Sequence, residues 1–391
     1  MNIEEIKLRL HRDIKKLRSS RGYLNAGYPR YYTLFGRDSI ISAWQMLKID
    51  PTIAKATLSV LSEYQGKVVD PKSEEEPGKI LHEHRFTPRE QAEIPEWKFP
   101  YYGSIDSTPL YIILAAKYLK TTNDTAFLSK IWRNIQAAFN WIITYGDKDG
   151  DGYIEYQRMN PHGLFHQGWR DGCEDHLKIK PPVAIVEAQG YVYAAYHSLA
   201  YISQRLGKNN NLIGEAMERA RKLKKNFNQD FWMEEEKFFA LALDGEKKQK
   251  KVVSSNPGHL LFTGIIDDSK VDYVVERLFQ PDLWTPYGIR THSMKAPDFD
   301  PYSYHLGSIW PHDNWIIYKG LQKLGYHQHA EKIKQALLQA YQKLNKIPEL
   351  YTVINNKIVD LSTPIKGVHH VLANPLQAWA SAGLLEMIVN N

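Results

Sequence analysis

The stretch Gly163–Leu177 carries residue types that can cleave a glycosidic bond. Its centre holds a flat aromatic ring, a guanidinium group and three carboxylates: Trp169, Arg170, Asp171, Glu174 and Asp175. Glycoside hydrolysis needs one carboxyl group to protonate the leaving oxygen and a second to activate water or attack the anomeric carbon. A solvated loop whose charges pair with one another has the same composition. The stretch is therefore a candidate sugar-cleaving site, with a surface loop as the alternative.

Two further segments concentrate polar and aromatic side chains. Arg37 and Asp38 end the segment Tyr28–Ser39 at a predicted helix start, where they could hold two adjacent sugar hydroxyls. An N-cap aspartate beside a surface arginine is the alternative. The run 287–314 contains a second cluster, far from the first in sequence: Arg290, His292, Tyr304, His305, Trp310, His312 and Asp313.

The segment Asp147–Gly152 resembles the start of a calcium-binding loop, because its aspartates alternate before a glycine. The twelfth position is Arg158, where an EF-hand requires a bidentate glutamate. An Asp/Gly turn at the end of a helix explains the pattern equally well. We therefore expect no metal and no cofactor, with calcium at Asp147–Gly152 as the open alternative.

The composition is that of an ordinary globular chain with many aromatic rings. The 391 residues are 43% hydrophobic and 24% charged, which argues against disorder. Aromatic residues make up 12% of the chain, and such rings can stack on the apolar faces of sugars or simply fill a core. The lone Cys173 excludes an intrachain disulfide and favours a reducing compartment. We expect this thiol to be buried in packing rather than to act as a nucleophile.

Charge and hydropathy argue against nucleic acid and membrane partners. The net charge is +6, but the lysines are dispersed, and the densest run, Lys247–Lys251, is typical of a solvated loop. The first twenty residues are charged and amphipathic and lack the apolar core of a secretion signal. The longest apolar run, Val183–Ala200, is interrupted by polar residues and predicts a buried helix. A cytoplasmic location is expected.

Apolar residues recur at helical spacing along most of the chain, whereas strand alternation is scarce. Predicted helices fall at 3–17, 40–47, 53–64, 110–119, 125–143, 182–206, 212–228, 268–279, 308–324, 328–345 and 374–389. Helical hairpins joined by long loops favour a toroid with an inner and an outer ring. Helices that are apolar on all sides, such as 183–200, fit the inner ring. Helices with a single apolar face, such as 125–143, fit the outer ring. We expect one domain over residues 1–391, with residues 1–20 as a helical appendage.

Ten segments in order resemble the amylo-α-1,6-glucosidase (glycogen-debranching-like) family of six-hairpin glycosidases. They are AGYPRYYTLFGRDSII (Ala26–Ile41), GKILHEHR (Gly78–Arg85), YYGSIDSTPL (Tyr101–Leu110), DGDGYIEY (Asp149–Tyr156), QGWRDG (Gln167–Gly172), EAQGYVYAA (Glu187–Ala195), NPGHLL (Asn256–Leu261), YGIRT (Tyr287–Thr291), YHLGSIWPHDN (Tyr304–Asn314) and QAWAS (Gln377–Ser381). The resemblance implies an all-α (α/α)6 toroid and hydrolysis with inversion.

The resemblance also assigns roles to individual residues. Asp171 matches the general acid, and Glu349 in IPELY resembles the general base. Arg37 and Asp38 match a pair in the innermost sugar subsite. The remaining predicted substrate-binding residues are Tyr102, Asp106, Trp169, Arg170, Glu187, Gln189, Trp310, His312 and Asp313.

The predicted reaction sets electrostatic requirements for these groups. Asp171 must keep its proton at the working pH, whereas Glu349 must be ionised. An arginine in contact with Asp171 would lower its pKa, so we expect Arg170 to point at substrate or at another acid. The two carboxyl groups of an inverting site stand roughly 6.5–9.5 Å apart.

The sequence therefore predicts an inverting hydrolase that releases glucose from α-glucosides, with α-1,6-linked substrates preferred. The same fold could act on an α-1,4-maltooligosaccharide, trehalose or glucosylglycerate. A toroid that binds carbohydrate without cleaving it is the alternative from another class.

Overall fold

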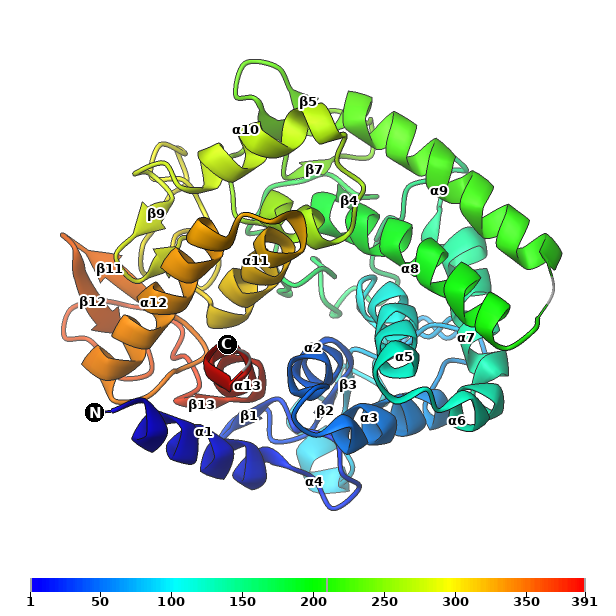
Figure 1. The fold of residues 1–391 in the computed structure, drawn as a ribbon, viewed down its shortest axis with the longest axis horizontal. Helices are drawn as coiled ribbons and strands as arrows, with labels where there is room; N and C mark the ends of the chain where they lie inside the picture. The colour runs from blue at the N-terminus through cyan, green and yellow to red at the C-terminus, as the bar shows by residue number, and fades with distance from the viewer. Residues whose placement is uncertain (1, 209, 390–391) are drawn as a thin grey trace.

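Six inner elements form a closed ring in the computed structural model, which describes residues 2–208 and 210–389 (Figure 1). They are α2 (Gly36–Met46), α5 (Ser107–Thr122), α8 (Val186–Arg205), the 3₁₀ helix η2 (Asn256–Phe262), α11 (Pro311–Leu324) and α13 (Ala378–Val389). Each packs on the next in this order, and α13 packs on α2. The expected (α/α)6 toroid is thereby confirmed.

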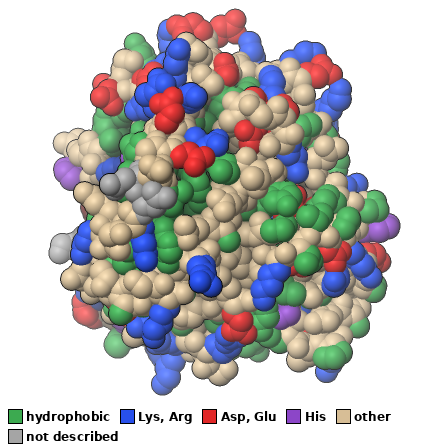
Figure 2. All heavy atoms as spheres, turned by 90° about the vertical axis from the view of Figure 1, so that its right-hand side faces the viewer, with side chains coloured by type: hydrophobic (Ala, Val, Ile, Leu, Met, Phe, Trp, Pro, Cys, Tyr) green, Lys and Arg blue, Asp and Glu red, His purple; other side chains and the backbone are tan. Residues whose placement is uncertain are grey.

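An outer ring of helices covers the inner one. It consists of α1 (Ile3–Leu17), α3 (Pro51–Glu63), α6 (Thr125–Lys130) with α7 (Trp132–Trp141), α9 (Asn210–Asp230), α10 (Asp268–Leu278) and α12 (His327–Leu344). Two short helical segments, α4 (Pro88–Gln91) and the π-helix η1 (Ile142–Gly146), lie in connections. Lys and Arg lie among Asp and Glu on the side that carries α9, rather than in one basic stripe (Figure 2).

Burial follows the ring to which a helix belongs. Every residue of α2 is buried, and α8 is buried over most of its first half. The outer helix α1 buries a single stripe, Ile6, Leu10, Ile14 and Leu17, against α13. An inner helix touches neighbours on all sides, whereas an outer helix needs only one apolar face. The predicted inner position of 183–200 and outer position of 125–143 are both confirmed.

One inner element differs from the sequence prediction. Asn256–Phe262 lies outside the predicted helices, but it forms η2 and takes the fourth inner position, between α8 and α11. Gly258 allows η2 to pack closely on α11, because a Cβ atom at this position would lie 2.6 Å from Ile317 Cγ1 of α11. A 3₁₀ turn this short leaves no helical periodicity to detect.

Short antiparallel ladders tie the connections together near the starts of the inner helices. The pairs are β1 (Gly27–Tyr28) with β13 (Leu376–Gln377), β2 (Leu34–Phe35) with β3 (Glu83–His84), β4 (Ala184–Ile185) with β7 (Ala242–Leu243), β7 with β8 (Gln249–Lys250), β5 (Trp232–Met233) with β6 (Phe238–Phe239), β9 (Trp284–Thr285) with β10 (Gly288–Ile289), and β11 (Tyr351–Ile354) with β12 (Lys357–Asp360). Among the described residues, no helix has both the length and the apolar character needed to cross a membrane.

Candidate active site

A large cleft opens where the inner helices begin. Its volume is about 1110 Å³, and it is lined by residues from the connections that precede α2, α8, α11 and α13. Arg37, Asp38 and Trp379 stand in the first turns of α2 and α13. Helix N-termini present free backbone N–H groups and a positive dipole end. The cleft is therefore suited to a ligand rich in oxygen atoms.

Asp171 projects into this cleft from the segment Gly163–Leu177. Its Oδ2 accepts a hydrogen bond of 3.0 Å from Arg37 Nη1, and His82 Nε2 lies 4.0 Å away. Burial raises the pKa of Asp171, and the charge and hydrogen bond of Arg37 offset only part of that rise. A carboxyl group with a raised pKa can keep a proton for a leaving group.

Glu349 lies in the connection before β11 and lines the same cleft. Its Oε1 accepts a hydrogen bond of 2.6 Å from the Tyr304 hydroxyl, and its Oε2 accepts one of 2.8 Å from the Asn374 backbone N–H. Burial raises the pKa of Glu349 to about 7, although both hydrogen bonds lower it. The side chain is thus held in one orientation and ionises near neutral pH. The sequence predicts an ionised Glu349, and with this pKa the ionised fraction changes with pH around neutrality.

Arg37 and Asp38 both line the cleft, as the sequence predicts, but their polar atoms point to different partners. Arg37 donates to Asp106 (2.7 Å), to the Gly168 carbonyl (2.8 Å) and to Asp171. This guanidinium therefore holds the loop that carries Asp171 against the start of α5. Asp38 accepts a hydrogen bond of 3.0 Å from Gln377 Nε2. Burial raises the pKa of Asp38 to about 8, which favours its protonated form at neutral pH.

Aromatic rings form the floor of the cleft. Trp169, His305, Trp310 and Trp379 all line it. The ring centroids of His305 and Trp310 are 5.4 Å apart in a stacked arrangement. The indole N–H groups of Trp169 and Trp379 and the Nε2 of His305 are buried without a protein partner. Since buried polar groups normally have partners, these atoms are available to hydroxyl groups of a ligand.

Seven predicted binding residues lie behind the cleft and do not line it: Tyr102, Asp106, Arg170, Glu187, Gln189, His312 and Asp313. Each is at most 3% exposed. Their surroundings are protein groups; Asp313 accepts from His259 Nε2 (2.7 Å), and Glu187 accepts from Asn256 (2.9 Å). The structure therefore places these seven residues in the wall rather than at the cleft surface, and their contact with substrate stays a prediction.

Arg170 illustrates the difference. The sequence predicts that it points at substrate or at another acid; it donates to the Thr291 carbonyl and lies 3.4 Å from His292 Nδ1. Burial lowers its pKa, and the charges of Asp313, Glu187 and Asp298 offset only part of that fall. Among the described residues no ion pair joins Arg170 to Asp171, and Arg37 is the guanidinium that lowers the pKa of Asp171. Cys173 also differs from expectation, since it is exposed and lines the cleft.

The family follows from comparison with known proteins. A family model described as the mannosylglycerate hydrolase MGH1-like glycoside hydrolase domain matches residues 31–353. The chain belongs to this family. It is therefore a glycoside hydrolase. The resemblance to six-hairpin glycosidases is correct at the level of fold and enzyme class, but the assignment to glycogen debranching is not supported.

Solved structures of GH63 mannosylglycerate hydrolase from Thermus thermophilus share the fold. One, in complex with Tris and D-glycerate, is 13% identical with a TM-score of 0.71 and covers 99% of this chain and 100% of that chain. Another, in complex with glucose, is 14% identical with a TM-score of 0.72 and the same coverage. Among curated proteins, none matches the chain.

Several residues of this MGH1-like site were not predicted from the sequence. Tyr304 and Gln377 were noted in motifs, but not as partners of Glu349 and Asp38. Trp379 lies in QAWAS, whose place at the start of a predicted helix could have identified it. Arg158 also lines the cleft, although the sequence suggested only a calcium-loop position for it.

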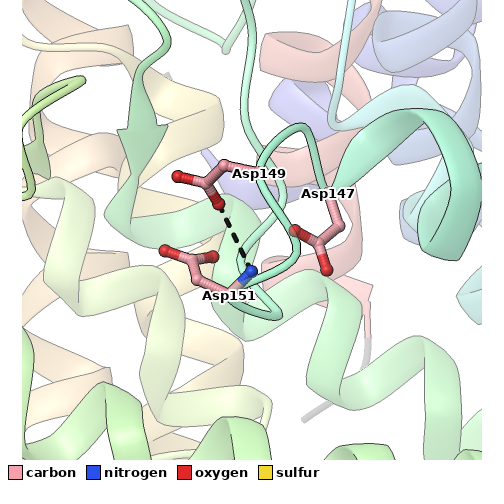
Figure 3. Close-up of side chains that lie close together, drawn as sticks. All are labelled: Asp147, Asp149 and Asp151. Atoms are coloured by element: carbon pink, nitrogen blue, oxygen red, sulfur yellow. Dashed lines mark hydrogen bonds between the residues drawn. The ribbon is translucent and has the colours of Figure 1, made fainter.

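In the Asp147–Gly152 loop, Asp149 and Asp151 point the same way, whereas Asp147 is turned toward the backbone of the loop (Figure 3). One ligand oxygen from each of Asp147, Asp149 and Asp151 lies within 4.8 Å of the others. The Lys247 ammonium lies 2.8 Å from Asp149 Oδ2 and 2.6 Å from Asp151 Oδ2, and it also pairs with Glu155. A lysine from a distant loop therefore supplies the positive charge next to these carboxylates.

Proposed function

We propose that this chain is an inverting glycoside hydrolase that removes a hexose from a small α-glycoside of glycerate. The observation that carries the proposal is the pair Asp171 and Glu349, which line one cleft from connections on different parts of the ring. The description of the family supports a small substrate.

The two carboxyl groups divide the reaction between them. Asp171 donates its proton to the glycosidic oxygen as the bond to the anomeric carbon breaks. Glu349 accepts a proton from a water molecule, whose oxygen attacks the anomeric carbon from the opposite face. Tyr304 and the Asn374 N–H orient the base, and Arg37 orients the acid. The products are a sugar of inverted configuration and the free alcohol.

The floor of the cleft is suited to the sugar. Trp169, Trp310 and Trp379 present apolar rings to a pyranose face, and the unpartnered indole N–H groups are donors for hydroxyl groups. A protonated Asp38 would donate to one further sugar oxygen. These groups bind the sugar that is released.

Arg158 is proposed to bind the glycerate carboxylate. Of the arginines that line the cleft, Arg37 and Arg85 pair with carboxylates, whereas Arg158 makes no ion pair among the described residues. Its Nη1 donates to the carbonyls of Gly163 and Cys173, both at 3.1 Å. These contacts hold the guanidinium against the loop that carries the proposed acid. The D-glycerate complex of the Thermus thermophilus enzyme gives the choice of aglycone.

Hydrolysis of a substrate panel tests the proposal. Glucosylglycerate and mannosylglycerate are compared with isomaltose, panose, maltose and trehalose, and the anomer formed first is followed by NMR. We expect a glycerate glycoside to be the preferred substrate and the β-anomer to form first. Faster hydrolysis of isomaltose would overturn the choice of aglycone, and initial release of the α-anomer would overturn inversion.

A second comparison tests Arg158. Glucosylglycerol has the shape of glucosylglycerate without the charge, so Arg158→Met should lower kcat/KM for the glycerate substrate by about tenfold or more and change that for glucosylglycerol little. Arg89→Met on the exposed helix α4 is the control. Equal losses on both substrates would show that Arg158 only supports the loop.

A further inference from the structure

A second cavity lies at the end of the toroid opposite the active site. Its volume is about 170 Å³, and it is lined by α5, α8, α11 and the end of η2. Asp106 precedes α5 at the catalytic end, whereas Lys117 lies eleven residues later, about 16 Å along a helix axis. The cavity is therefore separate from the cleft that holds Asp171 and Glu349.

The lining of this cavity is basic. Lys117 and Lys120 come from α5, His197 from α8 and Lys323 from α11. Among its described lining residues there is no aspartate or glutamate. Ser198, Tyr201 and Thr263 also line it; the hydroxyl of Thr263 donates to the Leu260 carbonyl, and that of Tyr201 accepts from Arg205. Cations and hydroxyls without a carboxylate are the groups that bind an oxyanion.

Lys117 is the central residue of this cluster. Its ammonium lies 4.0 Å from the centroid of the Trp44 ring and 5.9 Å from that of Phe262. Within the described part of the chain it forms no ion pair of 4.0 Å or less with a carboxylate. Burial lowers the pKa of Lys117 to about 7, and the charges of Lys319, Lys323 and Lys120 add to this effect. A cation held without a counter-ion is costly, so a bound anion would relieve it.

Helix dipoles explain only part of this cluster. Lys120 lies in the last turn of α5, and Lys323 Nζ donates to the Phe262 carbonyl at 2.7 Å. Cations at these positions compensate the negative ends of helices. Lys117 precedes the last turn of α5, and its charge faces aromatic rings instead of carbonyls. The dipole therefore does not account for Lys117.

We propose that this cavity binds a compact oxyanion: inorganic phosphate, or the phosphate group of a small phosphorylated metabolite. The cavity has room for one such group. A neighbouring cavity of about 470 Å³ shares His197 and is lined by Arg221, Lys224, Lys225 and Lys270 together with Asp267, which gives space for the rest of a phosphorylated molecule. The anion raises the pKa of Lys117, so binding takes up a proton near neutral pH. The other titratable groups around it are Lys120, His197, Lys319 and Lys323.

Titration calorimetry with inorganic phosphate at constant ionic strength tests the proposal. We expect one saturable site, and an enthalpy that depends on the ionisation heat of the buffer because a proton is taken up. Lys117→Met keeps the length of the side chain and removes the charge, so it should weaken binding by about tenfold or more. Lys323→Gln should weaken it too. The control Lys130→Met, on exposed α6, should bind as the unmodified protein does.

Two results would overturn the proposal: phosphate binding no stronger than that of chloride, or equal affinity in the Lys117→Met and Lys130→Met proteins. Circular dichroism checks that each variant is folded. A hexose phosphate distinguishes the two sources of the anion. Tighter binding than phosphate supports a phosphorylated metabolite that extends into the neighbouring cavity, and equal binding supports free phosphate.

Discussion

Asp171 and Glu349 share one cleft but differ in their surroundings. Asp171 is about a quarter exposed at its side chain (27%) and contacts a guanidinium. Glu349 is 3% exposed and accepts hydrogen bonds from a phenol and a backbone N–H. Such unlike environments allow two carboxyl groups to take different roles at one pH.

Removal of either carboxyl group should lower kcat by about 10²–10⁴-fold. Asp171→Asn cannot protonate a leaving group, whereas Glu349→Gln cannot activate water. α-Glucosyl fluoride separates the two roles, because fluoride leaves without a proton. We expect the Asp171 variant to hydrolyse it and the Glu349 variant not to. Glu174→Gln, exposed in the same loop, is the control and should remain active. Loss of fluoride hydrolysis in the Asp171 variant would reject its role as the acid.

The pH dependence of kcat/KM should be bell-shaped, with the rising limb set by Glu349. Its pKa is raised to about 7, and the base must be ionised, so activity should increase as the pH rises through that value. Tyr304→Phe removes a hydrogen bond that stabilises the ionised form. The limb should therefore move to higher pH. Tyr302→Phe, which alters another tyrosine of the cleft, should leave it in place. An unmoved limb in Tyr304→Phe would mean that another group is the base.

At the scale of elements, the Asp147–Gly152 loop shows how a distant residue completes a local pattern. Asp147 accepts hydrogen bonds from the N–H groups of Gly150 (2.8 Å) and Gly152 (3.1 Å), so the turn is closed by its own backbone. Asp149, Asp151 and the nearby Glu155 all pair with the single ammonium of Lys247. The lysine joins this loop to the β7–β8 hairpin.

Lys247→Met should lower the stability of the protein by about 1–3 kcal/mol at neutral pH, because Glu155 is buried and would lose its cation. The measurement is urea unfolding. Lys248→Met is the matched control, since its ammonium is exposed and pairs with Glu246. Calcium should not raise the melting temperature of the unmodified protein. A calcium-dependent rise would instead favour the metal-loop interpretation of these aspartates.

At the scale of the whole molecule, the first and last helices are neighbours. The first helix α1 packs on the last helix α13, which in turn packs on α2 (Figure 1). We propose that α1 belongs to the single toroidal domain and is not an appendage. The ring places the starts of α2 and α13 side by side, and this brings Asp38 to Gln377.

A comparison of two leucines in α1 tests whether this helix supports the ring. Leu10 is fully buried, whereas Leu8 is 64% exposed. Leu10→Ala should cost about 2–5 kcal/mol of unfolding free energy, and Leu8→Ala should change it by less than about 0.5 kcal/mol. If both variants unfold at the same denaturant concentration, then α1 is an appendage that does not support the ring.

The sequence by itself determined most of the helices, the inner place of α8 and the outer place of α7, and the choice of Asp171 and Glu349 as candidate carboxylates. Apolar spacing repeats locally, so α8 and α7 could be placed before any contact was known. Asp171 could be selected because the residues next to it in the chain form the motif QGWRDG. These features depend on residues that are close in sequence.

Only the tertiary structure decided which polar side chains face the cleft. Arg170 adjoins Asp171 in sequence, yet it is buried behind the wall, while Arg37 reaches the acid from α2. Lys247 meets Asp149 across 98 positions of the chain. These contacts form because the ring closes. Ring closure depends on the packing of helices that are far apart in sequence, and a local pattern of residue types carries no information about that packing.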